Sequence, residues 1–353
     1  MHARSTTALI LLTLTATLAA APQNDADRAK VIDLAKAGRI GEAISAYDKL
    51  TGDGKTPDRT ALAAIATGAA AAMAGSANLD ARLSACGSAL LIDQAQAMCR
   101  RALETIATQG KDSGEQALAA YTLANAGLRV VPGLMSTFET NMTRDMRLLI
   151  AQTKTRLPPA ERLSLLRPLL GDREVPVQYQ AVLALVNVPG DDAAAAIRNA
   201  DPGGPVGMVR SVALARHGDA AAAASLAALM PSLNGYLMIQ AGRALAENLN
   251  PKGIEILEEM RQSPVDLDRV MAAEALGRIN PDAAYRTLIA SLSGGSAAVK
   301  PAALHAAGVV RMGTDPAVYH LLGDADETIR AAAIDAVAET LAPPSPAPAR
   351  GRL

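Results

Sequence analysis

The most reactive side chains in this 353-residue sequence belong to two cysteines, Cys86 and Cys99. On one continuous helix they would lie about 20 Å apart, too far for a disulfide. Leu91-Ile92-Asp93 interrupts that helix, and Asp93 followed by Gln96 has the spacing of a capping box that starts a new helix. The cysteines flank this break at similar distances, so an antiparallel hairpin would bring the two sulfurs together. We predict a disulfide between them; two separate buried thiols are the alternative.

The other residues that could perform catalysis do not form a recognisable motif. His217, His305 and His320 lack the spacing of metal ligands and have no cysteine close by in the sequence. Gly203-Gly204-Pro205 lacks the lysine of a phosphate-binding loop, and the Gly-x-Ser-x-Gly motif of a nucleophilic serine does not occur. The sequence therefore predicts no catalytic residue, no metal site and no cofactor.

Small or apolar residues three positions apart recur along the second half of the chain. The first members of successive pairs are separated by 30, 30, 31, 31 and 30 residues. The pairs are Ala181/Ala184, Ser211/Leu214, Ala241/Ala244, Ala272/Ala275, Ala303/Ala306 and Ala333/Ala336. A spacing of three and four residues is typical of an amphipathic helix. Because one helix pair cannot bury its apolar face alone, this period predicts a one-dimensional stack of helix pairs.

Start and stop signals place two helices in each repeat. First helices are predicted to begin at Asn250-Pro251, Asn280-Pro281 and Asp315-Pro316, and a second helix at Ser263-Pro264, because an N-cap followed by proline favours a helix start. Glycines typical of helix ends follow the expected helices. They are Gly171, Gly218, Gly294 and Gly323.

The second helices resemble those of HEAT repeats, in particular short bacterial ones. The stretches 177–185 (VQYQAVLAL), 268–276 (DRVMAAEAL) and 329–337 (IRAAAIDAV) are similar to the family's V-R-x-A-A-x-x-A-L pattern. The resemblance covers about 158–341. It implies an all-α fold, an α-solenoid of stacked antiparallel helix pairs whose second helices line a concave face. The unit at 191–218 departs from the pattern, because Gly207 replaces the usual aliphatic residue.

Polar side chains recur at fixed positions of the second helices. In a HEAT-like solenoid these positions would line the concave face, so we predict a partner-binding surface there, with Glu274 and His305 exposed. Its residues are Gln178, Gln180, Arg210, Gln240, Arg243, Arg269, Glu274, Lys300, His305, Arg330 and Asp335. Ordinary solvation of a helix face is the alternative interpretation.

The first 20 residues have the features of a secretory signal peptide. Arg4 supplies a positive charge, residues 7–18 an apolar run, and 19–21 the small residues at which such peptides are cleaved. The apolar run is shorter than the roughly 20 residues that span a bilayer. We therefore expect an exported protein, periplasmic or extracellular, whose mature chain begins near Ala21.

Four segments are expected along the chain. They are a signal peptide (1–20), an N-terminal helical region (21–156), a HEAT-like array (157–341) and a disordered proline-rich tail (342–353). In the N-terminal region, one set of residues has the spacing of half a tetratricopeptide repeat; we expect a helical hairpin there, and a true tetratricopeptide unit is the alternative. The set is Gly38, Ala43, Tyr47 and Leu50.

Composition limits the class of partner. Only 2% of the residues are aromatic, which argues against a β-sandwich or barrel. With 34 basic and 35 acidic residues, the chain has no net field that would attract nucleic acid. We expect a non-catalytic scaffold or adaptor that binds another protein or peptide, not nucleic acid, and that keeps no membrane segment after signal cleavage. A HEAT-like lyase-type enzyme or enzyme-associated subunit and a structural envelope spacer are the alternatives.

Overall fold

The computed structural model describes residues 24–52, 56–128, 147, 158–200, 206–277 and 279–343. The predicted signal peptide and residues 344–353 of the predicted tail lie outside the described residues. The described chain is all-α, without a strand, as expected. The N-terminal part contains a helix over 24–36, followed by α2 (Ile40–Thr51), α3 (Arg59–Met73), α4 (Leu79–Ile92), α5 (Ala97–Gln109) and α6 (Ser113–Asn125). None of the described helices is long and apolar enough to cross a bilayer.

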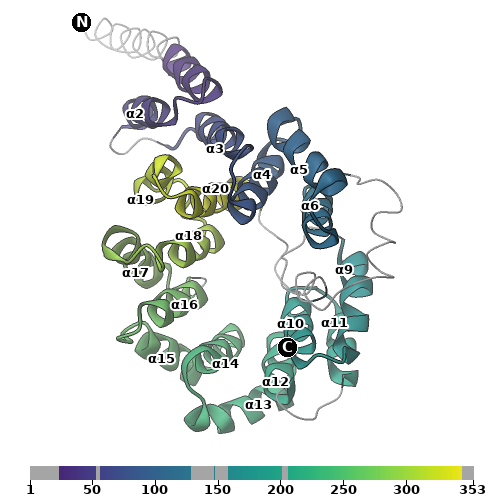
Figure 1. Cartoon of the computed structure of the whole chain (residues 1–353). Coiled ribbons are helices and arrows are strands. Elements are labelled where there is room, and N and C mark those ends of the chain that lie inside the picture. Colours follow the sequence, from purple (N-terminus) through teal and green to yellow (C-terminus); the bar gives the residue numbers. More distant parts are fainter. Residues whose placement is uncertain are drawn as a thin grey trace, which may run out of the picture.

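The second half of the chain consists of consecutive helix pairs (Figure 1). The first helices are α9 (Pro159–Leu166) with η1 (Arg167–Gly171), α11 (Asp191–Asn199), α13 (Ala220–Leu229) with η2 (Met230–Ser232), α15 (Pro251–Met260), α17 (Pro281–Gly294), and α19 (Pro316–Tyr319) with η3 (His320–Gly323). The second helices are α10 (Val175–Leu185), α12 (Val206–Arg216), α14 (Gly235–Glu247), α16 (Asp266–Leu276), α18 (Lys300–Val309) and α20 (Glu327–Leu341). Each second helix packs against the next one along the chain.

The periodic small residues lie where the second helices meet. Both members of the pairs in α14, α16, α18 and α20 are buried. In the first two units Ala181 and Leu214 are buried, whereas Ala184 and Ser211 are only partly so. Small side chains let neighbouring helix backbones approach closely. Because each second helix packs on the next, one small pair is needed in every helix pair, and the pairs recur about every 30 residues.

Most helix starts follow the sequence, and two differ. Asn250, Asn280 and Asp315 cap their helices as predicted, each accepting a hydrogen bond from a backbone N–H of the first turn. Ser263 does not cap α16, which begins three residues later; its hydroxyl instead accepts from the N–H of Val265 in the turn. Here Pro264 has no N–H and the chain stays extended at Val265.

The predicted capping box at the start of α5 is also wrong in register. Asp93 ends α4 in an extended conformation and accepts a hydrogen bond from the N–H of Ala95. Gln96 is the cap of α5, and its side chain accepts from the N–H groups of Met98 and Cys99. The turn between the helices takes up the residues that the capping box assigned to the new helix.

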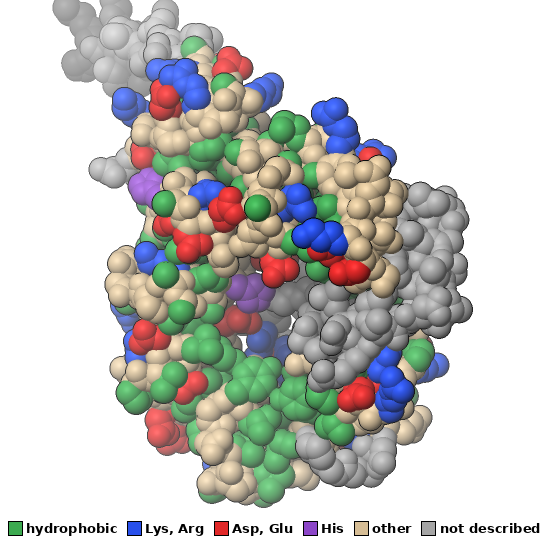
Figure 2. Space-filling view, in the orientation of Figure 1, with side chains coloured by type: hydrophobic (Ala, Val, Ile, Leu, Met, Phe, Trp, Pro, Cys, Tyr) green, Lys and Arg blue, Asp and Glu red, His purple; other side chains and the backbone are tan. Residues whose placement is uncertain are grey.

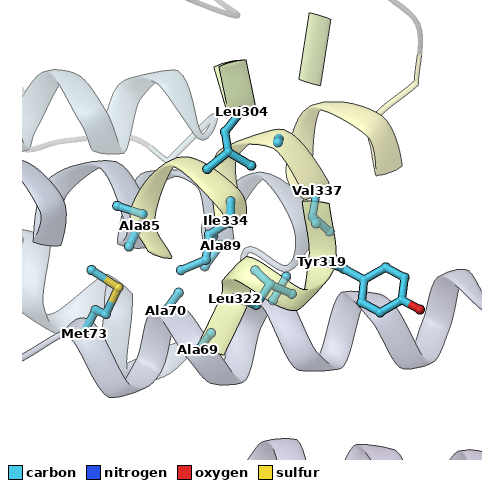
Figure 3. Packing of buried hydrophobic residues seen from close by; sticks show 14 of the residues in the cluster. Ala69, Ala70, Met73, Ala85, Ala89, Leu304, Tyr319, Leu322, Ile334 and Val337 are labelled. Atoms are coloured by element: carbon cyan, nitrogen blue, oxygen red, sulfur yellow. The ribbon is translucent and has the colours of Figure 1, made fainter. Parts of the chain in front are cut away.

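The two ends of the described chain pack against each other. α20 contacts α3 and α4, and η3 contacts α2 and α3 (Figure 1). One apolar cluster includes buried residues from Val31 to Ala126 and from Val270 to Val337. Figure 3 shows Ile334 of α20 among Ala85 and Ala89 of α4. We call this contact between α2–α4 and η3–α20 the seam.

Polar bonds also cross the seam. Asp48 of α2 accepts a hydrogen bond from the hydroxyl of Tyr319 at 2.8 Å and lies 3.0 Å from Nε2 of His320. On α3, in the loop after it and on α4, the bonds join Arg59 to the carbonyl of Leu341 (2.9 Å), Ser76 to Glu327 (2.6 Å) and Ser88 to Asp335 (2.9 Å). The expectation of a one-dimensional stack is therefore incomplete. In an open stack, the first and last helices present polar outer faces to solvent. Here the apolar faces of the terminal helices bury each other instead.

The close approach of α14 and α15 allows a test of the packing. A Cβ atom at Gly253 would lie 2.5 Å from the backbone nitrogen of Ala246 and 2.5 Å from the carbonyl oxygen of Gly242. Because backbone atoms cannot move aside cheaply, Gly253→Ala is expected to lower the free energy of unfolding by about 1–3 kcal/mol. Denaturant melts of the native chain and the variant measure this difference.

The matched control is Gly41→Ala, near the start of α2. A Cβ there meets nothing within 4 Å. Because alanine is the better helix former, this variant should be neutral or stabilised by up to about 1 kcal/mol. Equal destabilisation by both substitutions would contradict the packing of α15 on α14.

Candidate functional site

The predicted partner-binding residues all lie on second helices, and all are partly buried. The expectation that Glu274 and His305 are exposed is wrong. Only 20% of the Glu274 side chain and 40% of the His305 side chain are accessible, because each faces a charged residue of a neighbouring helix. Two groups can be separated by what the side chains bind, and Gln180, Gln240 and Lys300 belong to neither.

The first group fastens the turn inside each helix pair. Gln178, Arg269 and Arg330 each donate a hydrogen bond to the backbone carbonyl six residues earlier in the chain. Arg210 donates instead to the carbonyls of Ile197 and Arg198 at the end of α11. Carbonyls at a helix end and in a turn have no partner within the helix, so these side chains satisfy them. These four predicted binding residues therefore have a structural role.

The second group forms a row of polar side chains that pair between α12 and α14, between α14 and α16, and between α18 and α20. Arg243 of α14 lies 3.1 Å from Glu274 of α16 and 3.1 Å from Glu247 one turn later in its own helix. Farther along, Nδ1 of His305 lies 3.7 Å from the carboxylate of Asp335. We call this row the inner ladder. Its members are Arg216, Arg243, Glu247, Glu274, His305 and Asp335.

The inner ladder begins at α12, and its other end crosses the seam. At one end Arg216 of α12 contacts Glu247 at 2.8 Å. At the other end Asp335 accepts a hydrogen bond from the Ser88 hydroxyl of α4, across the seam. Arg216 and Glu247 were missed by the sequence analysis. The available signal was their separation of 31 residues, the same as that between Arg243 and Glu274.

The charges at the α12–α14 end of the ladder stabilise one another. Burial alone would raise the pKa of the Glu247 carboxyl, but the attraction of Arg216 and Arg243 outweighs burial and lowers this pKa. Burial likewise opposes the charge of Arg243, whereas Glu274 and Glu247 raise its pKa. These groups are consequently ionised at neutral pH and fix one another in position.

The helices α14, α16, α18 and α20 border one side of a central hollow. Figure 2 shows this hollow, with acidic, histidine and basic side chains following one another along the edge that α14, α16, α18 and α20 form in Figure 1. Two of the ladder contacts given above pair α14 with α16 and α18 with α20. Side chains of both charges are therefore presented next to the hollow.

The contacts among Ser88, Asp335 and His305 do not have the order of a catalytic triad. In a triad the histidine lies between the serine and the carboxylate, so that it can take the hydroxyl proton. Here the carboxylate of Asp335 lies between Ser88 and His305, and Ser88 is buried. Within the described part of the chain, no group of histidine, cysteine and carboxylate side chains could hold a metal ion.

The two cysteines face each other between α4 and α5. Both are fully buried free thiols, and their helices pack together as a hairpin. A hydrogen bond to Cys86 and burial raise the pKa of the Cys99 thiol. Two buried thiols that lie close together between paired helices are the arrangement from which a disulfide forms in an oxidising compartment. The disulfide stays a prediction.

Thiol counting tests this pairing. In denaturant, unreduced protein from its native compartment should show no free thiol, because an exported chain would be oxidised there. After reduction it should show two. Two free thiols before reduction would contradict the disulfide.

Comparison with known proteins assigns no family. No protein-family model matches the chain, and no curated protein matches it in sequence. The resemblance to HEAT repeats therefore depends on the repeated residues given above. The function depends on the geometry of the second helices.

Proposed function

We propose that this chain is an exported, non-catalytic protein of stacked HEAT-like helix pairs that binds another protein on its inner face. The inner face is the surface of α14, α16, α18 and α20 beside the hollow in Figure 2. The observation that carries this proposal is the inner ladder. It presents charged side chains along consecutive helices in positions that their own contacts already fix.

Fixed polar groups suit recognition better than freely moving ones. Ordering a long side chain at an interface costs about 0.5–1.5 kcal/mol, and a side chain already held by a neighbour avoids most of that cost. The accessible edges of Glu274, His305 and Asp335 leave room for further hydrogen bonds to a partner. Alternating charges then select a partner whose charges are complementary.

The absence of catalysis is proposed on chemical grounds. The four turn-fastening residues already donate to backbone carbonyls. The ladder arginines Arg216 and Arg243 are neutralised by Glu247 and Glu274. The hydroxyl of Ser88 has a carboxylate, not an imidazole, as its hydrogen-bond acceptor. These contacts favour a binding surface over an acid–base or nucleophilic site.

Site-specific photo-crosslinking in the native cell envelope tests the binding face. Gln240 lies one turn before Arg243 on α14, so the two side chains share a side of that helix. A photoreactive residue at this position should crosslink one defined partner. The matched control is Glu255, an exposed residue of the first helix α15. Equal crosslinking from both positions, or none from position 240, would contradict the proposal.

Export is tested separately by sequencing the amino terminus of the protein from the envelope fraction. The expected result is a mature chain that begins near Ala21, because signal peptidase cleaves after small residues. A cytoplasmic protein that retains Met1 would contradict export, while leaving the proposal for the inner face unaffected.

A further inference from the structure

Two clefts lie at equivalent places in the stack of helix pairs. One, of about 490 Å³, lies between the turn that joins α15 to α16 and the second half of α17. The other, of about 590 Å³, lies between η1, α10 and α11. In both, the turn of one helix pair faces the first helix of the next pair. Such a cleft is thus a product of the stacking itself.

Most residues that line the cleft beside η1 have a counterpart 91 positions later that lines the other cleft. Leu170, Gln178 and Ala195 are three of them. That separation equals three repeats. The later residues are Arg261, Arg269 and Arg286. At these three positions uncharged side chains are replaced by guanidinium groups, and we call the cleft between the α15–α16 turn and α17 the arginine cleft.

Two of these arginines are held in place and one is not. Arg261 is bound by Glu258 at 2.8 Å, and Arg269 is bound by Asp266 and by the carbonyl of Ser263. Arg286 is exposed and makes no hydrogen bond or ion pair with any residue that the structure describes.

Among the residues that line the arginine cleft, three are arginines and one, Asp266, is acidic. Asp266 and Glu258 offset two of the three positive charges, and one guanidinium is left over. The turn therefore supplies a fixed wall of guanidinium N–H donors whose charge is offset by these carboxylates. Arg286, on the opposite wall, supplies a cation that can turn toward a ligand.

We propose that the arginine cleft is a binding site for an anionic oxygen group, a carboxylate or a phosphate carried by another molecule. A guanidinium presents its N–H donors in a planar fork that matches two oxygens of such a group, and charge-assisted hydrogen bonds of this kind are the strong ones. Thr287 and Ser291 also line the cleft, but their hydroxyls donate to carbonyls of their own helix, so the guanidinium groups are the donors left for an anion. The site lies outside the inner face, so it goes beyond the proposed function and does not depend on it.

Calorimetric titration of the full mature chain tests this site with two probes, inorganic phosphate and acetyl-triaspartate amide. Arg286→Ala restores the residue found at the corresponding position 195, and an exposed helix residue changed to alanine should leave the fold intact. The expected result is binding weakened on the order of tenfold for whichever probe binds the native chain, because one charge-assisted contact is lost. The probe that binds identifies the source of the anion.

The control is Arg101→Ala on α5, which removes an exposed arginine of equal charge outside the cleft. It should leave probe binding unchanged, and binding to the native chain should weaken as salt is raised. Equal affinities of the native chain and the Arg286→Ala variant would overturn the proposal. So would an equal loss in the control, or failure of both probes to bind the native chain.

Discussion

Ile334→Ala is expected to lower the free energy of unfolding by about 2–5 kcal/mol, because it empties a fully buried site at the centre of the seam. The side chain lies on α20 among alanines of α4 (Figure 3), and small neighbours cannot collapse to fill the space. Because the seam joins both ends of the chain, the variant should also exchange amide hydrogens faster in α3 and α4. Denaturant melts and hydrogen exchange resolved by helix measure the two effects.

The matched control is Ile239→Ala on α14. Ile239 is equally buried, but its cluster contains only residues of α14, α15 and α16. A similar loss of stability is expected, with faster sub-global exchange confined to these helices and their neighbours. If Ile334→Ala left exchange in α3 and α4 at the native rate, the seam would not be a stabilising contact in solution.

The seam is the part of the fold that the sequence did not predict. Helix starts such as Asn250-Pro251 depend on neighbouring residues, and the alanine period depends on contacts one repeat away, so both can be found along the chain. By contrast, Ser76 and Glu327 are 251 residues apart, and Ser88 and Asp335 are 247 apart. No local pattern indicates which distant helix will cover an apolar face.

Tyr47 illustrates the same limit. Its spacing from Gly38, Ala43 and Leu50 predicts a helical hairpin, and the helix over 24–36 with α2 forms one. Within that hairpin a buried tyrosine is expected to pack on its own helices. Instead its ring meets that of Tyr319 edge-on, with ring centroids 5.1 Å apart. Local spacing predicted the element correctly but not the surface that the element packs against.

The candidate site was predicted in part. The sequence located the periodic polar positions on the second helices, and Arg243, Glu274, His305 and Asp335 do form a row there. It did not separate these residues from Gln178, Arg269 and Arg330, whose side chains reach turn carbonyls. Both groups recur with the same period, and only the backbone geometry of the turns distinguishes a fastening residue from a ladder residue.

The carboxylate of Glu247 carries the second prediction of a large effect. Glu247→Gln keeps the size of the side chain but removes the carboxylate that Arg216 and Arg243 share. These side chains are only 10–20% accessible, so breaking the contact leaves a largely buried positive charge. Such a change costs about 3 kcal/mol at neutral pH. Denaturant melts at pH 7 measure the loss.

Glu104→Gln is the matched control, because Arg100 and Glu104 form an ion pair with the same spacing of four residues at 2.8 Å. Their side chains are 50% and 48% accessible, so water already solvates both charges. The expected loss is within about 0.5 kcal/mol. Equal losses for the two variants would mean that the ladder contacts are no stronger than an ordinary surface pair.

Acid should remove the effect of Glu247→Gln but not reverse it. The pKa of Glu247 is lower in the folded chain than the ordinary value of 4.5, so its carboxylate stabilises the fold above that pH. As the pH falls through the lowered folded-state pKa, the carboxyl becomes protonated and its stabilisation is lost. The difference in unfolding free energy between the native chain and the variant should therefore be largest at pH 7 and shrink steadily toward pH 3. A difference that stayed constant over this range would show that Glu247 acts through its shape and not through its charge, and the inner ladder would lose its electrostatic basis.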